Sequence, residues 1–448
     1  MQWDRGGAVS VTSVSEGVQG GWKGRALRCF PGGSNGEYGI PENQIPVLER
    51  GLGARVWDTE GVEFLDFTMA WGSTLAGHAH PKLLEAAARA GRDGVNFAAV
   101  NRRAVELAER IMALSRCAER IRFVASGTEA TLLCLRVAHA ATGRRKVVRF
   151  EGAYHGQHPV GIAGMIAGRP SALPLCDPTG AGAPWVENDV LVAPYNDLIA
   201  TEAILSAVAV DIAAVIVEPL HRCLSPAPGF LEGLRAVTRR LGIVFIFDEV
   251  VTGFRLAAGG AQEYYGVTPD LVAYGKGLGG GFPIGAYAGR ADLMESVSEH
   301  RLPRADYAWS ASTTGGNPIS CAAALAMLDL LAEPGIYPHL HEMGRRFRDG
   351  LRVILAGQSV AGQVLGDGPL GQVAFSSVPV VNQQAWLASD RARGRRVMLS
   401  LLRRGVFLNP MGTKMYLSLA HDTPELVGFF ERFTEALGDS DTENGALS

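Results

Sequence analysis

Lys276 is the residue of this sequence best suited to act as a nucleophile. The chain has 42 lysines and arginines, and only five of them are lysines. Of these five, Lys276 alone stands between two glycines at the end of a short apolar run, LVAYGKG. An amine that is partly desolvated at a strand end can lose its proton and attack an aldehyde. We therefore expect Lys276 to form a Schiff base.

An acidic residue ends a second apolar run. The run IVFIFDEV reaches Asp248, which lies 276 − 248 = 28 residues before Lys276. That separation leaves room for one crossover and one strand, so both residues are expected at the carboxyl edge of one sheet, where ligands bind. The alternative is a solvated strand end or a helix cap.

The segment SGTEA, residues 126–130, suits a phosphate group. It follows the apolar run IRFVA and opens a helical pattern. Ser126, Gly127 and Thr128 would offer backbone N–H groups, hydroxyls and the positive end of a helix dipole. The alternative is an ordinary helix N-cap with Glu129 in the first turn.

Tyr154 adds an aromatic surface to this set. In EGAYHG it follows the apolar run VVRF, where its ring can stack on a flat heteroaromatic ring. A phosphate cradle, an aromatic platform, a carboxylate and a lysine are the parts of a pyridoxal 5′-phosphate (PLP) site. A competing dinucleotide motif, G-x-G-x-x-G at 275–280, needs a helix that the following Gly-Phe-Pro disfavours.

Short apolar runs alternate with helical patterns in the middle of the chain. This alternation predicts an α/β fold with a mostly parallel sheet covered on both faces. The segment 54–67 reads as a β-hairpin, and GQVAFSS and MYLSLA suggest strands near the C-terminus. We expect three parts, namely an N-terminal segment (1–75) that joins a small domain, a large cofactor-binding domain (76–325) and the small domain itself (326–448). Residues 1–36 are rich in Gly and Ser and are expected to be loop-like.

Composition excludes several classes of function. The formal net charge of -3 and the pI of about 6.4 do not favour binding to nucleic acid or to a membrane surface. No run of ~18 apolar residues predicts a transmembrane helix. The six cysteines form no C-x-x-C pair, so we expect no metal site, and reduced thiols are typical of a cytoplasmic enzyme.

Six motifs in order resemble a known family. SGTEA, YHG, VIVEP, FDEVVTGFR, AYGKGLGGGFPIGA and TTGGNP occur as in the class III (subgroup II) PLP-dependent aminotransferases. WGSTLAGHAHP, RFEGAYHG, APYNDL and LSLAH are most similar to the glutamate-1-semialdehyde aminomutase branch. The resemblance implies the PLP-dependent transferase fold type I, with a large domain built on a mixed, mostly parallel sheet and a smaller α+β domain. It also implies a homodimer with shared active sites.

The same resemblance assigns roles to individual residues. Lys276 would carry PLP, Asp248 would face the pyridinium nitrogen, and Tyr154 would stack on the ring with His155 beside it. The remaining cofactor contacts that it implies are Ser126, Gly127, Thr128, Glu218, Val250 and, toward the neighbouring subunit, Thr313. The expected substrate contacts are Trp71 and Lys414.

The sequence departs from the family where substrate is bound. Cys223 stands where many ω-amino enzymes have a glutamate, and Lys414 stands near an acidic position of the aminomutases. The stretch after YHG differs from the aminomutase loop. We therefore expect an aminotransferase that takes the amino group of a small-molecule donor, glutamate or glutamine. Its acceptor would be an aldehyde or ketone, such as an oxidised amino sugar in antibiotic biosynthesis. The alternatives are a glutamate-1-semialdehyde 2,1-aminomutase and a non-catalytic PLP-binding protein.

Overall fold

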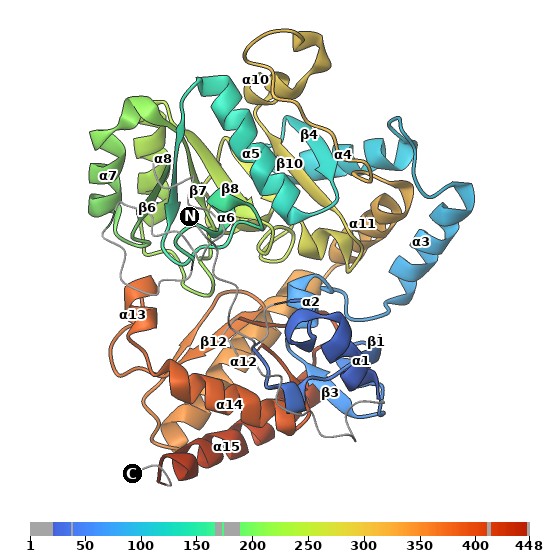
Figure 1. Ribbon diagram of the computed structural model, residues 1–448, viewed down its shortest axis with the longest axis vertical. Helices are drawn as coiled ribbons and strands as arrows, with labels where there is room; N and C mark the ends of the chain where they lie inside the picture. Colours follow the sequence, from blue (N-terminus) through green and yellow to red (C-terminus); the bar gives the residue numbers. More distant parts are fainter. Residues whose placement is uncertain (1–20, 37–38, 166–172, 174–188, 410–413, 446–448) are drawn as a thin grey trace, which may run out of the picture.

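A seven-stranded sheet forms the centre of the larger part of the molecule (Figure 1). The structure is a computed structural model that describes residues 21–36, 39–165, 173, 189–409 and 414–445. The strands lie in the order β4 (Arg120–Val124), β10 (Gly285–Gly289), β9 (Leu271–Tyr274), β8 (Val244–Glu249), β7 (Ile212–Val217), β5 (Lys146–Phe150) and β6 (Val190–Ala193). Only β10 runs antiparallel to its neighbours, and the other pairs are parallel. The predicted α/β fold with a mixed, mostly parallel sheet is confirmed.

Both faces of this sheet are covered, which explains why its central strands are apolar throughout. Alternate residues of β7 and β8 enter different cores, with Val215 and Phe245 in one and Ala214 and Ile246 in the other. Helix α5 (Gly127–Thr142) covers one face. The helices whose apolar side chains cover the other face are α4 (Arg102–Leu114), α7 (Leu198–Ala207), α8 (Phe230–Leu241) and α11 (Pro318–Leu331).

A smaller part combines the two ends of the described chain. The predicted hairpin is confirmed, because β2 (Arg55–Asp58) pairs antiparallel with β3 (Glu63–Asp66). β3 then pairs parallel with β13 (Val406–Phe407), and β1 (Leu48–Leu52) completes this sheet. These pairings place strands from the N-terminal segment and the C-terminal part in one sheet.

A second small sheet and three long helices complete this part (Figure 1). The sheet contains β11 (Gln363–Leu365), β12 (Leu370–Ala374) and β14 (Met415–Tyr416). The helices are α12 (Ile336–Gly357), α14 (Arg391–Arg403) and α15 (Thr423–Gly445). The division at residues 75 and 325 stays a prediction, and α11 continues past 325 while packing in the larger core.

Shorter helices connect these elements. They are α1 (Trp22–Cys29), α2 (Met69–Gly72), α3 (Pro81–Asp93, the longest of this group), α6 (Pro159–Ile162), α9 (Gly260–Tyr264), α10 (Ala291–Met294) and α13 (Gln383–Leu387). The loop-like interpretation of residues 1–36 is wrong for α1, where the Arg25 guanidinium stacks 4.2 Å from the Trp22 ring centre. Residues 1–20 lie outside the described ranges.

Membrane-spanning potential is confined to one bent pair of helices. Within the described ranges, no single helix is long and apolar enough to cross a membrane. Helices α11 and α12 reach that length and composition only together, across a bend of 79°.

Phe67 joins the N-terminal segment to the core of the smaller part. Its ring lies 5.4 Å from Phe347 and 4.5 Å from Phe429, centre to centre. Phe67→Ala should lower the free energy of unfolding by about 3–5 kcal/mol, because the cavity lies among well-packed rings. Chemical denaturation measures this, with Val353→Ala as control, since that α12 side chain is 71% exposed. A loss no larger than that of the control would contradict the assignment.

Candidate active site

The reactive groups gather at the carboxyl ends of the central strands. Asp248 is the last residue but one of β8, in register with Ala273 of β9. Lys276 follows β9 and begins a short 3-10 helix, Lys276–Gly279. The structure thus brings the predicted amine and carboxylate to the same edge of the sheet.

Lys276 has an unusual backbone and an unusual acidity. Its φ of +40° lies in the left-handed region, which is costly for a residue with a side chain. Burial lowers the pKa of the Lys276 amine to about 8, with nearby Lys414 and Arg222 acting in the same direction and Asp248 opposing them. About a tenth of this amine is therefore unprotonated at pH 7, far more than for a lysine of ordinary pKa, which suits it to attack an aldehyde.

Asp248 is held by its neighbours rather than by solvent. Its Oδ2 lies 2.7 Å from His155 Nδ1, and both side chains are buried. Its Oδ1 accepts a hydrogen bond from the Val250 backbone N–H at 3.1 Å. The other ring nitrogen of His155, Nε2, is buried and has no hydrogen-bond partner in the described part of the chain. The Asp248 carboxylate is therefore held in a fixed position at this edge of the sheet.

Glu218 forms the second carboxylate centre of the site. Its oxygens accept the backbone N–H of Tyr154 at 3.0 Å and that of Arg222 at 3.3 Å. Lys414 Nζ lies 3.5 Å from Glu218 Oε2. Burial alone would raise the pKa of the Glu218 carboxyl, but Lys414 and Arg222 outweigh it and hold that pKa well below its usual range. Glu218 is thus ionised and fixes the Tyr154 backbone.

Lys414 remains the least satisfied charged group of the site. It is 6% exposed, and its Nζ makes no hydrogen bond with any described residue. Burial lowers the pKa of its ammonium group, whereas Glu218 acts against that shift. A buried amine in this state stands ready to bind an additional acceptor.

The start of α5 suits a phosphate group because glycines let neighbouring segments of backbone pack closely there. A Cβ added to Gly127 would lie 2.8 Å from the Val250 side chain, and one added to Gly275 would lie 3.3 Å from Gly127 Cα. The first turn of a helix leaves N–H groups without intrahelical acceptors, and here these include Gly127 and Thr128. Ser126 acts as the N-cap, accepting from Glu129 N at 3.2 Å, so the alternative role considered for it is present.

Trp71 and Thr313 are the two remaining predicted site residues. Trp71 belongs to α2, a left-handed turn that contacts β14 and the short helix that starts at Lys276. Thr313 is exposed and its carbonyl accepts from Asn96 Nδ2 at 2.9 Å, so its role toward a neighbouring subunit stays a prediction. Most of the divergent stretch after Gly156 lies outside the described residues.

Arg222 was missed by sequence reasoning. Its Nε donates to the Gly152 carbonyl at 3.0 Å, and its guanidinium lies 5.9 Å from the Tyr154 ring centre. The residue follows β7 by five positions, so a search for basic residues after strand ends would have found it. Tyr154 itself is held between this cation and the Glu218 carboxylate.

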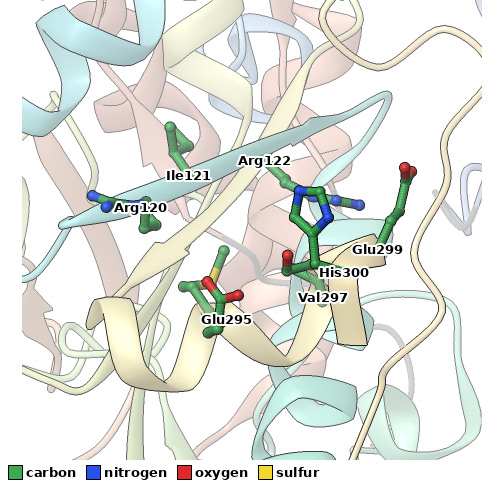
Figure 2. Close-up of a pocket in the computed structure, with 9 residues that line it drawn as sticks. Arg120, Ile121, Arg122, Glu295, Val297, Glu299 and His300 are labelled. Carbon is green, nitrogen blue, oxygen red and sulfur yellow. The ribbon is translucent and has the colours of Figure 1, made fainter. Parts of the chain in front are cut away.

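A surface cavity lies at the opposite edge of the sheet (Figure 2). It is lined by Arg120, Ile121 and Arg122 at the beginning of β4 and by residues from Met294 to His300. β4 runs from this cavity toward Ser126 at the other edge. The cavity therefore shares no side chain with the cluster around Lys276.

Comparisons with known proteins agree with this arrangement. The family model described as Aminotransferase class-III matches residues 40–434. A glutamate-1-semialdehyde 2,1-aminomutase of Desulforudis audaxviator (strain MP104C) is 39% identical, covering 92% of this chain and 95% of that protein. An omega-transaminase from Sphaerobacter thermophilus has a TM-score of 0.88 and is 35% identical, covering 93% and 96% of the two chains. A transaminase with PLP bound has a TM-score of 0.84 and is 28% identical, covering 94% and 97%.

The lowered pKa of Lys276 predicts how the cofactor-free protein reacts with PLP. Only the unprotonated amine attacks an aldehyde, so the attachment rate should rise through a midpoint near pH 8 rather than near 10.5. Lys276→Ala should form no adduct after borohydride reduction, whereas Lys82→Ala should react as the unaltered protein does. Peptide mass spectrometry locates the label, and its appearance on another lysine would contradict the assignment.

Asp248 should matter for turnover more than for cofactor binding. Asp248→Asn removes the negative charge but keeps the size of the side chain, so PLP should remain bound. The loss of one preorganised charge should lower kcat on the order of 100-fold. Steady-state rates and the bound-cofactor absorbance together check this, and an unchanged kcat would remove Asp248 from its proposed role.

Proposed function

We propose that this chain, which belongs to the class III aminotransferases, moves an amino group on a small substrate that carries a carboxylate. Enzymes of this class use PLP, and they take a small-molecule amino donor and acceptor. The substrate carboxylate is the new element of the proposal. It is carried by one observation, the buried Lys414 ammonium group that has no hydrogen-bond acceptor among the described residues.

The residues at the site fit PLP. Lys276 would supply the amine for its aldehyde, Asp248 a carboxylate for its ring nitrogen, and Gly127 and Thr128 the N–H groups for its phosphate. The unpartnered Nε2 of His155 beside Asp248 agrees with a polar ligand at this place. When bound, PLP supplies an aldehyde and a ring that withdraws electrons from the substrate carbon.

The chain's own residues would move the protons. When it is not attached to the cofactor, Lys276 Nζ would be the base that removes a proton from the carbon bearing the substrate amine. Its lowered pKa, about 8, leaves it able to accept a proton and to return it near neutral pH. Asp248 would keep its contact with His155, and Glu218 would keep Tyr154 in place throughout.

Lys414 and Arg222 would bind the substrate carboxylate. Both cations lower the pKa of the Lys276 amine. Glu218 is a shared neighbour of the two, and its oxygens already accept two backbone N–H groups. A second carboxylate would give Lys414 the acceptor that it lacks and would balance the charge of two cations by two anions.

Glutamate-1-semialdehyde is the first substrate that this proposal selects. It carries a carboxylate, and a relative that is 39% identical is named for its 2,1-aminomutation. The oxidised amino sugar expected from the sequence has less support, since a cationic sugar would meet Lys414 and Arg222. A homodimer, a cytoplasmic location and a role in antibiotic biosynthesis stay predictions.

Donor-dependent transamination is the second candidate. It is favoured by the likeness to an omega-transaminase and by Lys414, which stands near an acidic position of the aminomutases. In that reaction a donor such as glutamate would place its carboxylate on the same two cations. The candidates thus share a site and differ in whether a second substrate is needed.

Turnover without a donor separates the two candidates. The PLP-loaded enzyme receives glutamate-1-semialdehyde alone, and in a parallel assay an oxidised amino sugar or another aldehyde with glutamate. We expect 5-aminolevulinate in the first assay, with Lys276→Ala as the inactive control. Turnover in the second assay only would replace the aminomutase by the donor-dependent enzyme.

Lys414→Met tests the carboxylate site. Methionine keeps the length of the side chain but removes the charge, so kcat/KM for carboxylate substrates should fall about 10- to 100-fold. An amine without a carboxylate should lose less than about 3-fold, because it makes no charge-assisted hydrogen bond there. Lys82→Met is the control, since Lys82 is exposed and pairs with Glu333. Equal losses for both kinds of substrate would contradict the proposal.

A further inference from the structure

Arg255 is a buried cation without a carboxylate partner. It is fully buried, and no carboxylate of the described residues lies within ion-pair distance of it. Burial lowers the pKa of its guanidinium to about 10. Its Nε donates to the Val251 carbonyl at 3.0 Å and its Nη1 to that of Leu417 at 3.4 Å, while Nη2 donates to the carbonyl of Gly72. Three backbone carbonyls and the nearby Tyr416 ring compensate this charge in place of a carboxylate.

The three acceptors belong to three distant segments. Gly72 ends the α2 turn, Val251 follows β8, and Leu417 follows β14. The guanidinium also lies 5.5 Å from the Tyr416 ring centre. A planar group with five N–H donors can bridge acceptors in this way, whereas a single ammonium group cannot reach all three. Arg255 therefore joins the larger sheet to both parts of the smaller domain.

Strained backbone collects around this guanidinium. Among the described residues, nine other than glycine have a positive φ. Five of the nine lie in segments next to Arg255, namely 69–71 with φ of 45°, 49° and 59°, Phe254 with 57°, and Lys276 with 40°. A Cβ added to Gly277, the residue after Lys276, would lie 3.6 Å from Arg255 Nη2. Each such residue costs roughly 1–2 kcal/mol, and such conformations persist only where the surroundings hold them.

The α2 turn has no freedom beside Arg255. Asp66 Oδ1 accepts from the Thr68 and Met69 N–H groups at 2.7 and 2.9 Å. A Cβ on Gly72 would lie 2.5 Å from the Tyr416 ring and 3.2 Å from Arg255 Nη2. The turn is therefore fixed at its beginning by Asp66 and at its end by Arg255.

We propose that Arg255 is a positioning residue for the reaction at Lys276. It keeps the left-handed backbone of Lys276 at a fixed place relative to the α2 turn that carries Trp71. The inference rests on the proposed function, in which the Lys276 amine reacts. Without Arg255, Lys276 would relax toward an ordinary φ, and its amine would leave the groups that set its acidity, which are Asp248, Glu218, Lys414 and Arg222.

Arg144 is a matched control for a purely structural arginine. Its Nη1 also donates to three backbone carbonyls, those of Ile212 at 3.1 Å, Leu241 at 3.4 Å and Gly242 at 2.9 Å. These acceptors lie where β7 and β8 begin, at the opposite edge of the sheet from Lys276. Removing either arginine should destabilise the fold, but only the removal of Arg255 should change the reactivity of the Lys276 amine.

The experiment compares Arg255→Met, Arg255→Lys and Arg144→Met with the unaltered protein. Two readouts are taken, the pH midpoint at which the cofactor-free protein attaches PLP, and kcat with KM for the holoenzyme. Both methionine variants should melt at lower temperature. Only Arg255→Met should raise the pH midpoint above about 8, by a full unit or more, and lower kcat on the order of 100-fold with a smaller change in KM.

Arg255→Lys keeps the positive charge and supplies the variant that folds if Arg255→Met does not. Its pH midpoint should also rise and its kcat should fall, because one ammonium group cannot bridge three carbonyls. A pH midpoint and kcat equal to those of the unaltered protein, in whichever variant folds, would overturn the positioning role alone. If the unaltered protein forms no adduct at Lys276, the site assignment and this proposal fail together.

Discussion

The burial of the Lys276 amine among charged groups is the constraint on which the rest of the site depends. A buried amine loses its proton more easily, so burial lowers its pKa. Lys414 and Arg222 lower this pKa further, whereas Asp248 and Glu218 raise it. Lys276 and the first three of these groups to be reached along the chain lie at or after the ends of β7, β8 and β9. Lys414 lies directly before β14. The parallel sheet places the first three at one edge, and the C-terminal part brings Lys414 over them.

That arrangement explains why the smaller part must be firmly attached. Lys414 reaches Glu218 from directly before β14, whose Tyr416 packs in one cluster with Leu220 and Cys223 after β7, and Arg255 binds the carbonyl of Leu417 directly after β14. Phe67 secures the other side, since its ring packs in the core of the smaller part. The charges around the Lys276 amine therefore depend on how the two parts pack together. Residues with a strained backbone lie where the two parts meet, and such residues are typical of functional sites.

Sequence patterns predicted the sheet and its reactive edge for a physical reason. Strands buried on both faces are continuously apolar, so β7, β8 and β9 stood out, and Asp248 and Lys276 stood out at their ends. The contacts of Lys414 with Glu218 could not be predicted, because the two residues are distant in sequence and each has an ordinary neighbourhood. Arg255 ends the motif FDEVVTGFR, but its contacts could not be predicted, since its acceptors are backbone carbonyls that any sequence supplies. Helix α1 was missed because Gly and Ser dominate the composition of residues 1–36, in which it lies.

The central claim is that Lys276 reacts beside a carboxylate site built on Lys414. A crystal structure of the PLP-loaded protein with an unreactive carboxylate-bearing substrate analogue tests it most directly. The account predicts continuous electron density from Lys276 Nζ to the cofactor, and the analogue's carboxylate within hydrogen-bond distance of Lys414 Nζ. An analogue whose carboxylate lies elsewhere, with Lys414 still facing Glu218 alone, would contradict it.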